Sequence, residues 1–167
     1  MILAIDASTT SVGWALFFED SEGDGEFASS GTFLPIGDKA EDRIADYGLW
    51  LLDLLETNAK IHVVAYEIAS GAHGNMRTNR LLGGVEYLTR WVVRDCKNVE
   101  FVPVRTAQGR AAGAHKKNLG FAGLVRGKPF KWKSKAEKKR CGDEADAIGI
   151  GLAAQRLLRR KELVSVS

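Results

Sequence analysis

The sequence predicts an α/β fold: a mixed five-stranded sheet, made of an antiparallel meander plus parallel strands, flanked by helices. Two observations support this prediction. Short apolar runs of strand length end at turn residues, and later in the chain such runs alternate with longer segments of helical periodicity. The chain has 167 residues, of which 45% are hydrophobic. That is enough for one domain with its own core, so we expect a single domain over residues 1–167.

The first three strands form the predicted meander. Residues 1–7 are an apolar run that carries one acid, Asp6, near its end. A hydroxyl-rich turn leads into a second run at 12–18, and a turn rich in Gly and acids leads into a third run at 27–34. Pro35 ends this third run. Connections this short join antiparallel neighbours.

Helices and strands alternate in the remainder of the chain. The predicted helices cover 42–58, 76–96, 105–113 and 142–161, and the predicted strands cover 61–67 and 99–104. Such alternation implies parallel strands with helices on both faces of the sheet. Inside the second helix, Gly83 and Gly84 each cost about 1 kcal/mol relative to alanine. The pair therefore indicates close approach of another backbone, or a kink.

The cysteine pattern and the hydropathy indicate the compartment. Cys96 and Cys141 lie far apart and form neither a CxxC pair nor a zinc-binding spacing, which is typical of reduced thiols. No signal peptide precedes the first strand, and no apolar run approaches the roughly 18 residues of a membrane span. We therefore expect a soluble, cytoplasmic protein without a membrane partner.

Four acids stand out by their positions. Asp6 ends the first strand, and Glu67 ends the fourth. If these strands are parallel neighbours, both side chains emerge side by side at one edge of the sheet. Asp143 and Asp146 open the last helix in the stretch GDEADA and share one face of it, whereas Glu144 points elsewhere. We expect this helix to place its two acids over the same edge.

Converging carboxylates repel one another and raise each other's pKa unless a cation lies among them. Hard divalent ions with oxygen ligands, Mg²⁺ or Mn²⁺, suit such a cluster, and two of them can support phosphodiester cleavage. Each acid taken alone is also consistent with a purely structural role. Asp143 and Asp146 could cap the helix and favour its dipole, and Asp6 could bond to the following turn.

Basic residues are concentrated in one segment. Twelve of the 24 Lys and Arg residues, but one of the 21 acids, lie at 105–140. This segment therefore carries a formal charge of +11 and the rest of the chain −8. Such segregation indicates a polyanionic partner. We expect a basic DNA-binding segment at about 105–140, which neutralises phosphates without reading sequence. The alternative is a solvated surface loop.

The basic residues between the fifth strand and the last helix are Lys116, Lys117, Arg126, Lys128, Lys131, Lys133, Lys135, Lys138, Lys139 and Arg140. The residues expected to contact DNA are Arg77, Arg80, Arg105, Lys116, Lys117, Lys131, Lys133 and Lys135. Taken singly, Arg77 and Arg80 are equally consistent with ordinary surface charges. Phe130 and Trp132 could stack on exposed bases, but we expect them to pack the segment down.

Three stretches, AIDASTTSVGWAL, VVAYEIASGAHGNMRTNRLLGG and GDEADAIGIG, resemble the RuvC-like Holliday junction resolvases in order and spacing, and the small phage-borne branch in particular. The resemblance implies a ribonuclease H-like fold, a homodimer and a bacteriophage origin. It also implies four acids that bind two Mg²⁺ or Mn²⁺ ions. Carried over to this sequence, these catalytic and metal-binding acids are Asp6, Glu67, Asp143 and Asp146. The first stretch alone also resembles the phosphate loop of actin-like sugar kinases, which need two such domains.

The resemblance predicts a metal-dependent, structure-selective endonuclease that cuts four-way DNA junctions by paired symmetric nicks. The alternatives are a nuclease of the same fold for other branched DNA or RNA–DNA hybrid, and a non-catalytic DNA-structure-binding protein. The helix at 76–96 is the candidate dimer surface, unless it is buried within one subunit. Resolvases of this type often place an aromatic wedge after the strand-four glutamate. Here that segment contains no Phe or Tyr, and His73 and Met76 are the candidates to replace the wedge.

Overall fold

The computed structural model describes residues 1–19, 25–68, 76–112 and 119–165, with side chains described as far as Lys161. Its strands are β1 (Ile2–Ala7), β2 (Val12–Phe17), β3 (Phe27–Phe33), β4 (Val63–Ile68) and β5 (Glu100–Arg105). Its helices are α1 (Ala40–Thr57), α2 (Met76–Asp95), α3 (Thr106–Ala111), α4 (Leu119–Val125) and α5 (Lys135–Ser165). Within these ranges, no helix is long and apolar enough to cross a membrane.

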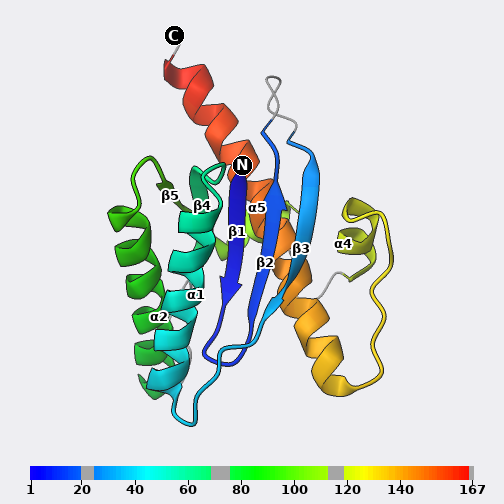
Figure 1. The fold of residues 1–167 in the computed structure, drawn as a ribbon. Helices are drawn as coiled ribbons and strands as arrows, with labels where there is room; N and C mark the ends of the chain where they lie inside the picture. The colour runs from blue at the N-terminus through cyan, green and yellow to red at the C-terminus, as the bar shows by residue number, and fades with distance from the viewer. Residues whose placement is uncertain (20–24, 69–75, 113–118, 166–167) are drawn as a thin grey trace.

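The five strands form one mixed sheet in the order β3-β2-β1-β4-β5 (Figure 1). β2 pairs antiparallel with both β1 and β3. β4 pairs parallel with both β1 and β5. The predicted combination of an antiparallel meander with parallel strands is therefore confirmed. Because β1, β4 and β5 run in the same direction, their carboxyl ends share one edge of the sheet.

Alternate residues of the strands supply two separate cores. Ile2 and Ala4 of β1 lie in a buried cluster with α5, whereas Leu3 and Ile5 lie in a second cluster with α1 and α2. All four side chains are fully buried, as the two-residue period of a strand requires when both faces are covered. The prediction of helices on both faces of the sheet is confirmed, with α1 and α2 on one side and α5 crossing the other (Figure 1).

The close approach of α5 to the sheet depends on glycine. A Cβ atom on Gly13 would lie 1.9 Å from the carbonyl oxygen of Asp143, and one on Gly151 would lie 2.1 Å from the ring of Phe17. Both distances are shorter than any real carbon contact allows, so a side chain at either position would push α5 away from β2.

The last helix begins earlier than the sequence pattern predicts. α5 starts at Lys135 rather than at residue 142, because Ser134 and Glu137 cap its first turn. The Ser134 hydroxyl accepts a hydrogen bond from the Glu137 N–H (3.2 Å), and the Glu137 carboxylate accepts one from the Lys133 N–H. The prediction that Asp143 and Asp146 open the helix is therefore wrong. Both lie roughly two to three turns inside it, where capping does not explain them.

Two further differences concern the basic segment. It contains a helix, α4, which the glycine-rich sequence LGFAGLV did not predict. Four of the residues placed before the last helix lie on α5 itself: Lys135, Lys138, Lys139 and Arg140. The basic charge therefore continues along the helix that carries Asp143 and Asp146.

The close approach predicted at the glycine pair in α2 is not made by the described part of this chain. The helix runs without a break from Met76 to Asp95. A Cβ atom on Gly83 would meet no described atom within 4 Å, and one on Gly84 would meet only Ile44 Cδ1, at 3.9 Å. Within the described part of the chain, no backbone comes close to either glycine.

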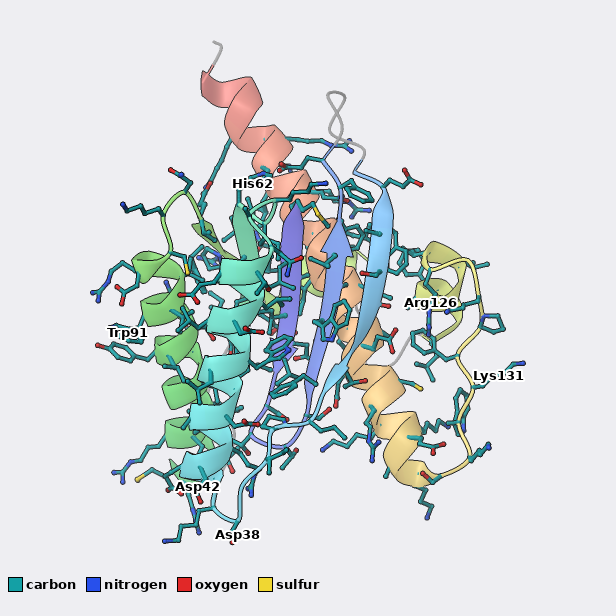
Figure 2. The ribbon with its side chains drawn as sticks, viewed as in Figure 1. Asp38, Asp42, His62, Trp91, Arg126 and Lys131 are labelled. Atoms are coloured by element: carbon teal, nitrogen blue, oxygen red, sulfur yellow. The ribbon has the colours of Figure 1, made fainter. Side chains whose placement is uncertain are left out.

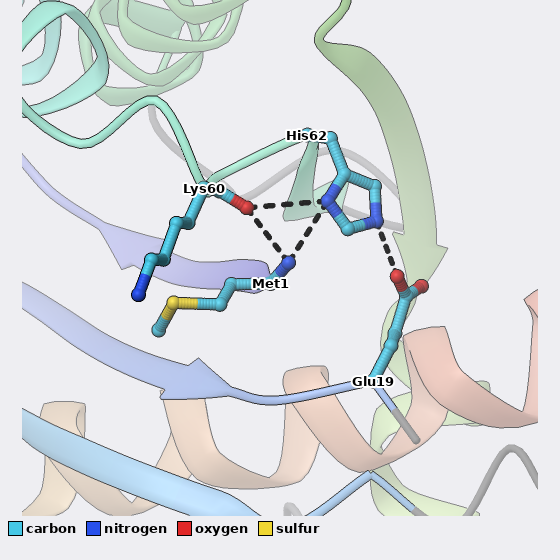
Figure 3. Close-up of polar contacts among 4 residues, drawn as sticks. All are labelled: Met1, Glu19, Lys60 and His62. Atoms are coloured by element: carbon cyan, nitrogen blue, oxygen red, sulfur yellow. Dashed lines mark hydrogen bonds and ion pairs between the residues drawn. The ribbon is translucent and has the colours of Figure 1, made fainter. Parts of the chain in front are cut away.

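A chain of polar contacts closes the end of the molecule remote from Asp42, near His62 (Figure 2). The Met1 ammonium donates to the Lys60 carbonyl oxygen (2.8 Å) and lies 2.8 Å from His62 Nδ1, and His62 Nε2 bonds to Glu19 (Figure 3). His62 Nδ1 also lies 3.2 Å from the Lys60 carbonyl oxygen, so the ammonium, the imidazole and the carbonyl meet at one point. These contacts join the starts of β1 and β4 to the end of β2.

Candidate active site

The pairing of β1 with β4 brings Asp6 next to Glu67. In this parallel pair Ile5 lies opposite Tyr66, and each acid follows directly after its member of that pair. Both carboxylates are half-buried and stand at the carboxyl edge of the sheet. The expectation that these two acids emerge side by side is therefore met by the strand register.

The contact at Gly13 brings α5 over the same edge. Gly13 lies opposite Asp6 in the β1–β2 pair, and its missing side chain leaves room for the backbone of Asp143. Asp143 and Asp146 are both half-buried on the face of α5 that turns toward β1. Glu144 points elsewhere, as predicted, since its carboxylate bonds to Ser30 of β3 (2.5 Å).

The pKa of the Asp6 carboxyl is shifted by the three other acids. Burial raises the pKa of the Asp6 carboxyl well above its usual value, and the charges of Asp146, Glu67 and Asp143 raise it further. The three other carboxylates are thus within electrostatic reach of Asp6. A cation placed among them would lower this pKa again.

The donor set fits the expected metal ions by its chemistry. It consists of carboxylate oxygens, which suit Mg²⁺ or Mn²⁺, whereas Zn²⁺ prefers nitrogen and sulfur. Among the residues that the structure describes, no three His, Cys, Asp or Glu side chains are already gathered into a metal-binding group. Like charges keep uncompensated carboxylates apart, so the ligand shell would close only around the ion.

Hydrogen bonds fix the turn that follows Asp6. Ser8 Oγ donates to the Ser11 carbonyl oxygen (2.9 Å) and accepts from the Ser11 N–H (3.2 Å). Arg43 of α1 donates through Nε to the Thr9 carbonyl oxygen (2.7 Å) and through Nη1 to that of Gly37 (2.8 Å). Arg43 could not be found from the sequence, because a contact across 34 residues leaves no local pattern.

Three of the expected DNA-binding residues lie near the carboxylates in the fold. Arg77 and Arg80 are exposed on the first turns of α2, which follows β4. Arg105 is exposed at the end of β5, opposite Ile68 of β4. Since β1, β4 and β5 end at one edge, Arg105 stands on the same side as Glu67. Lys116, Lys117 and His73 lie outside the described residues.

Residues 126–134, which we call the strap, join α4 to α5. Lys131 and Lys133 are exposed on the strap, and Lys135 is exposed at the first position of α5 (Figure 2 labels Lys131). Phe130 is 8% exposed, which confirms the prediction that it packs the segment down. Trp132 is 42% exposed, and one face of its ring lies against α5, with Lys138 Nζ 5.2 Å from the ring centre.

The two faces of α2 differ in exposure. Val85, Val92 and Val93 are buried against the rest of the chain. Tyr87 and Trp91 are 72% and 45% exposed, and Figure 2 shows Trp91 on the outer side of the helix. Met76, a candidate wedge residue, is also exposed, at the first position of α2. α2 is therefore not wholly buried within one subunit, because its outer face is exposed.

Comparisons with known proteins identify the fold. No protein-family model matches the chain, and no curated protein matches it. The structure of Thermus thermophilus RuvC in complex with a Holliday junction substrate matches with a TM-score of 0.74 and 14% identity over 95% of both chains. The yeast mitochondrial Holliday junction resolvase matches with a TM-score of 0.61 and 11% identity over 95% of this chain and 80% of its own.

A viral protein has the same architecture. The Fowlpox virus resolvase in complex with substrate Holliday junction DNA matches with a TM-score of 0.56 and 13% identity over 94% of this chain and 97% of its own. The chain therefore has the ribonuclease H-like fold of the RuvC-like resolvases over nearly its whole length, which confirms the resemblance seen in the three sequence stretches at the level of the fold.

Proposed function

We propose that this protein is a metal-dependent, structure-selective endonuclease that cuts four-way DNA junctions by paired symmetric nicks. The observation that supports the proposal most is the convergence of four acids: the β1–β4 register places Glu67 beside Asp6, and the contact at Gly13 brings Asp143 and Asp146 of α5 over them. The three other charges raise the pKa of Asp6. A cluster of four acids is costly for a fold without a cation, and perturbed acids of this kind concentrate at functional sites. The structures that share this fold include resolvases in complex with junction DNA.

The four acids would hold the metal ions of this activity. Asp6, Glu67, Asp143 and Asp146 would bind two Mg²⁺ or Mn²⁺ ions, which when bound activate water and stabilise the leaving oxygen of a phosphodiester. β1 and β4 orient Asp6 and Glu67 from the sheet, and α5 orients the other two from above. Rigid elements on both sides hold the carboxylates in place, as precise positioning requires.

The basic residues would hold the DNA backbone beside these acids. Lys131, Lys133 and Lys135 present exposed ammonium groups along the strap and the start of α5. Arg77, Arg80 and Arg105 lie on α2 and β5, at the other side of the carboxylates. Contacts with phosphates from both sides would position a strand across the site without reading its sequence.

A homodimer would match the near two-fold symmetry of a junction and place one site on each of two strands. The outer face of α2 is the proposed contact surface, because it exposes Tyr87 and Trp91 on one side of a single helix. Aromatic residues of this kind are enriched in protein–protein interfaces. The isologous contact of two α2 helices would cover both.

One observation favours a second candidate, a nuclease of the same fold with a broader range of branched substrates. The stretch IASGAHGNM between β4 and α2 contains no Phe or Tyr to act as a wedge in the junction centre. A panel of four-way junction, fork, flap and RNA–DNA hybrid separates the two candidates. Equal rates on junction and fork favour the broader nuclease.

The role of the acids is tested with Glu67→Gln and Asp146→Asn. Each variant should bind a labelled four-way junction with an affinity close to that of the parent protein, and its cleavage rate should fall by about 100-fold or more. Circular dichroism and thermal unfolding serve as the folding control. Cleavage at the parental rate by either folded variant would remove that residue from the proposed site, and a parent protein that binds without cutting would support a non-catalytic junction-binding protein.

A further inference from the structure

A buried ion pair joins the basic segment to α5. Arg126 follows directly after α4, and its Nη1 atom lies 3.5 Å from Oε1 of Glu144. The two side chains are only 15% and 10% exposed. The same Glu144 oxygen accepts a hydrogen bond from the Ser30 hydroxyl of β3 (2.5 Å). Three elements, α4, α5 and β3, therefore meet at one carboxylate, which directly follows Asp143 in the chain.

The guanidinium of Arg126 is directed into the molecule. Its Cζ atom lies 4.2 Å from the centre of the Phe130 ring, and Phe130 is itself buried. Its Nε atom is buried and has no hydrogen-bond partner in the described part of the chain. An arginine that binds a DNA phosphate presents its donors to solvent, whereas this one is committed to Glu144 and Phe130.

The far end of the strap is also attached to α5. The Glu137 carboxylate, the single acid of the basic segment, accepts from the Lys133 N–H. The Cys141 thiol points to the Lys131 carbonyl oxygen, with Sγ 3.9 Å from it. Cys141 lies three residues before Glu144 on α5, so the thiol is one helical turn from the ion pair.

We propose that Arg126 is a positioning residue whose ion pair with Glu144 clamps the strap against α5 next to Asp143. The clamp holds the exposed lysines of the strap at a fixed place relative to α5, the helix that carries Asp143 and Asp146. Its consequence for DNA rests on the proposed function, whereas the clamp itself is a property of the fold. Arg126 therefore differs from the exposed lysines of the strap, because its charge pairs with a carboxylate of the protein and not with a DNA phosphate.

Buried ion pairs have a distinctive response to substitution. Removing one partner leaves the other charged and buried, which is strongly destabilising, whereas replacing both partners together is often neutral. Arg126→Met should therefore release the strap, and adding Glu144→Gln should restore it. The glutamine retains an oxygen to accept the Ser30 hydroxyl, and the methionine covers the Phe130 ring. If Arg126 instead bound a DNA phosphate, the change at position 144 would not restore what the loss of Arg126 removes.

The experiment measures alkylation of Cys141 by iodoacetamide in a Cys96→Ser background, without DNA. Arg126→Met should accelerate the reaction about tenfold or more, because the half-buried thiol would lose its contact with the Lys131 carbonyl when the strap is released. The Arg126→Met/Glu144→Gln protein should return to within about threefold of the parent rate. Lys128→Met, an exposed basic residue of the same strap, is the matched control and should leave the rate unchanged. Loss of the Arg126 charge by itself would disfavour the reactive thiolate and slow the alkylation. A faster reaction therefore indicates that the thiol has become more exposed.

Junction cleavage in the same variants gives the second readout. It should fall in Arg126→Met and recover in the double variant. Unchanged alkylation in Arg126→Met, with weaker DNA binding that Glu144→Gln does not rescue, would make Arg126 a DNA ligand and overturn the proposal. If Arg126→Met alone does not fold, the double variant is compared with Glu144→Gln alone. Faster alkylation of the double variant than of Glu144→Gln would then overturn the proposed clamp. If the parent protein cuts no junction, the proposed function fails, while the alkylation series still decides on the clamp.

Discussion

Asp6 lies at the end of an apolar strand, where a carboxylate lowers the stability of the fold unless a cation compensates it. For an acid, a pKa that is higher in the folded than in the unfolded chain means that the folded chain binds the proton more tightly. Between those two values, stability falls as the pH rises, because the unfolded chain ionises more easily. The raised pKa of Asp6 therefore predicts a site that destabilises the metal-free protein at neutral pH.

We expect Asp6→Asn to unfold at a temperature about 3 °C or more above that of the parent protein in EDTA at pH 8, because it removes the repelled carboxylate. The difference should shrink as the pH falls toward 4, where the folded parent carboxyl is protonated and the unfolded one is about half protonated. Mg²⁺ should stabilise the parent protein more than the variant. Thermal unfolding followed by circular dichroism measures all three effects. A variant less stable than the parent at pH 8 in EDTA would show that Asp6 is not under the strain inferred here.

Gly13 determines how close α5 comes to β1, since its Cβ position is occupied by the carbonyl oxygen of Asp143 at 1.9 Å. We expect Gly13→Ala to displace Asp143 and to lower junction cleavage by about 100-fold, since small misplacements of catalytic groups cost this much. It should also destabilise the fold by about 1–3 kcal/mol through overpacking.

Gly83→Ala is the control for this substitution, because no described atom would lie within 4 Å of its new Cβ atom. In the helix α2 it should stabilise the protein by up to about 1 kcal/mol. Urea unfolding compares the two variants. Equal stability and equal cleavage for both would mean that α5 is free to shift away from Gly13.

The elements that were predicted best are those with strong periodicity. The strands of the meander and the helices α1 and α2 lie within about two residues of their predicted bounds, the usual uncertainty of helix and strand ends. The start of α5 was missed because its first two turns, KAEKKR, are mostly charged and carry no apolar stripe. The sequence did contain a signal for this start, the capping pattern of Ser134 and Glu137. α4 carried no such signal, since two glycines interrupt its short apolar run.

The exposed lysines at the strap and the start of α5 should contribute separate phosphate contacts. Lys131→Ala, Lys133→Ala and Lys135→Ala should each lower the slope of log K against log [salt] for junction binding by about 0.9. Lys60→Ala, at the end of the sheet remote from the carboxylates, should leave the slope unchanged. Fluorescence anisotropy between 50 and 200 mM salt, about the range over which such contacts are resolved, measures the slopes. Identical slopes for the parent and all three strap variants would remove the strap from the DNA interface.

At the scale of the whole molecule, the sequence predicted a mixed sheet with an antiparallel meander and parallel strands, and it predicted the meeting of Asp6 with Glu67 on the condition that their strands are parallel neighbours. Alternation of strand and helix patterns implies parallel neighbours, and parallel neighbours share an edge. The contacts of Gly13 with α5 and of Arg126 with Glu144 could not be predicted in this way. They depend on the distance and rotation between elements far apart in the chain, which periodicity does not specify.

The outer face of α2 should mediate dimerisation. We expect a Tyr87→Glu/Trp91→Glu protein to be monomeric at concentrations where the parent is a dimer, because two charges would be buried in a symmetric contact. Light scattering coupled to size exclusion measures the mass. Leu124→Glu on α4, where Leu124 is 81% exposed, is the control and should leave the mass unchanged. A parent protein that is monomeric throughout, or a dimer that survives both charges, would contradict this surface.

The central claim is that four converging carboxylates and a clamped basic strap make this fold a junction-cutting nuclease. The most direct measurement is cleavage of a labelled synthetic four-way junction, beside duplex of matched sequence, with Mg²⁺, Mn²⁺ or EDTA. We predict paired nicks at symmetric positions in the junction with either metal, none in EDTA, none in Asp6→Asn, and little cutting of the duplex. Nicks that persist in EDTA or in Asp6→Asn, or equal cutting of duplex and junction, would contradict the account.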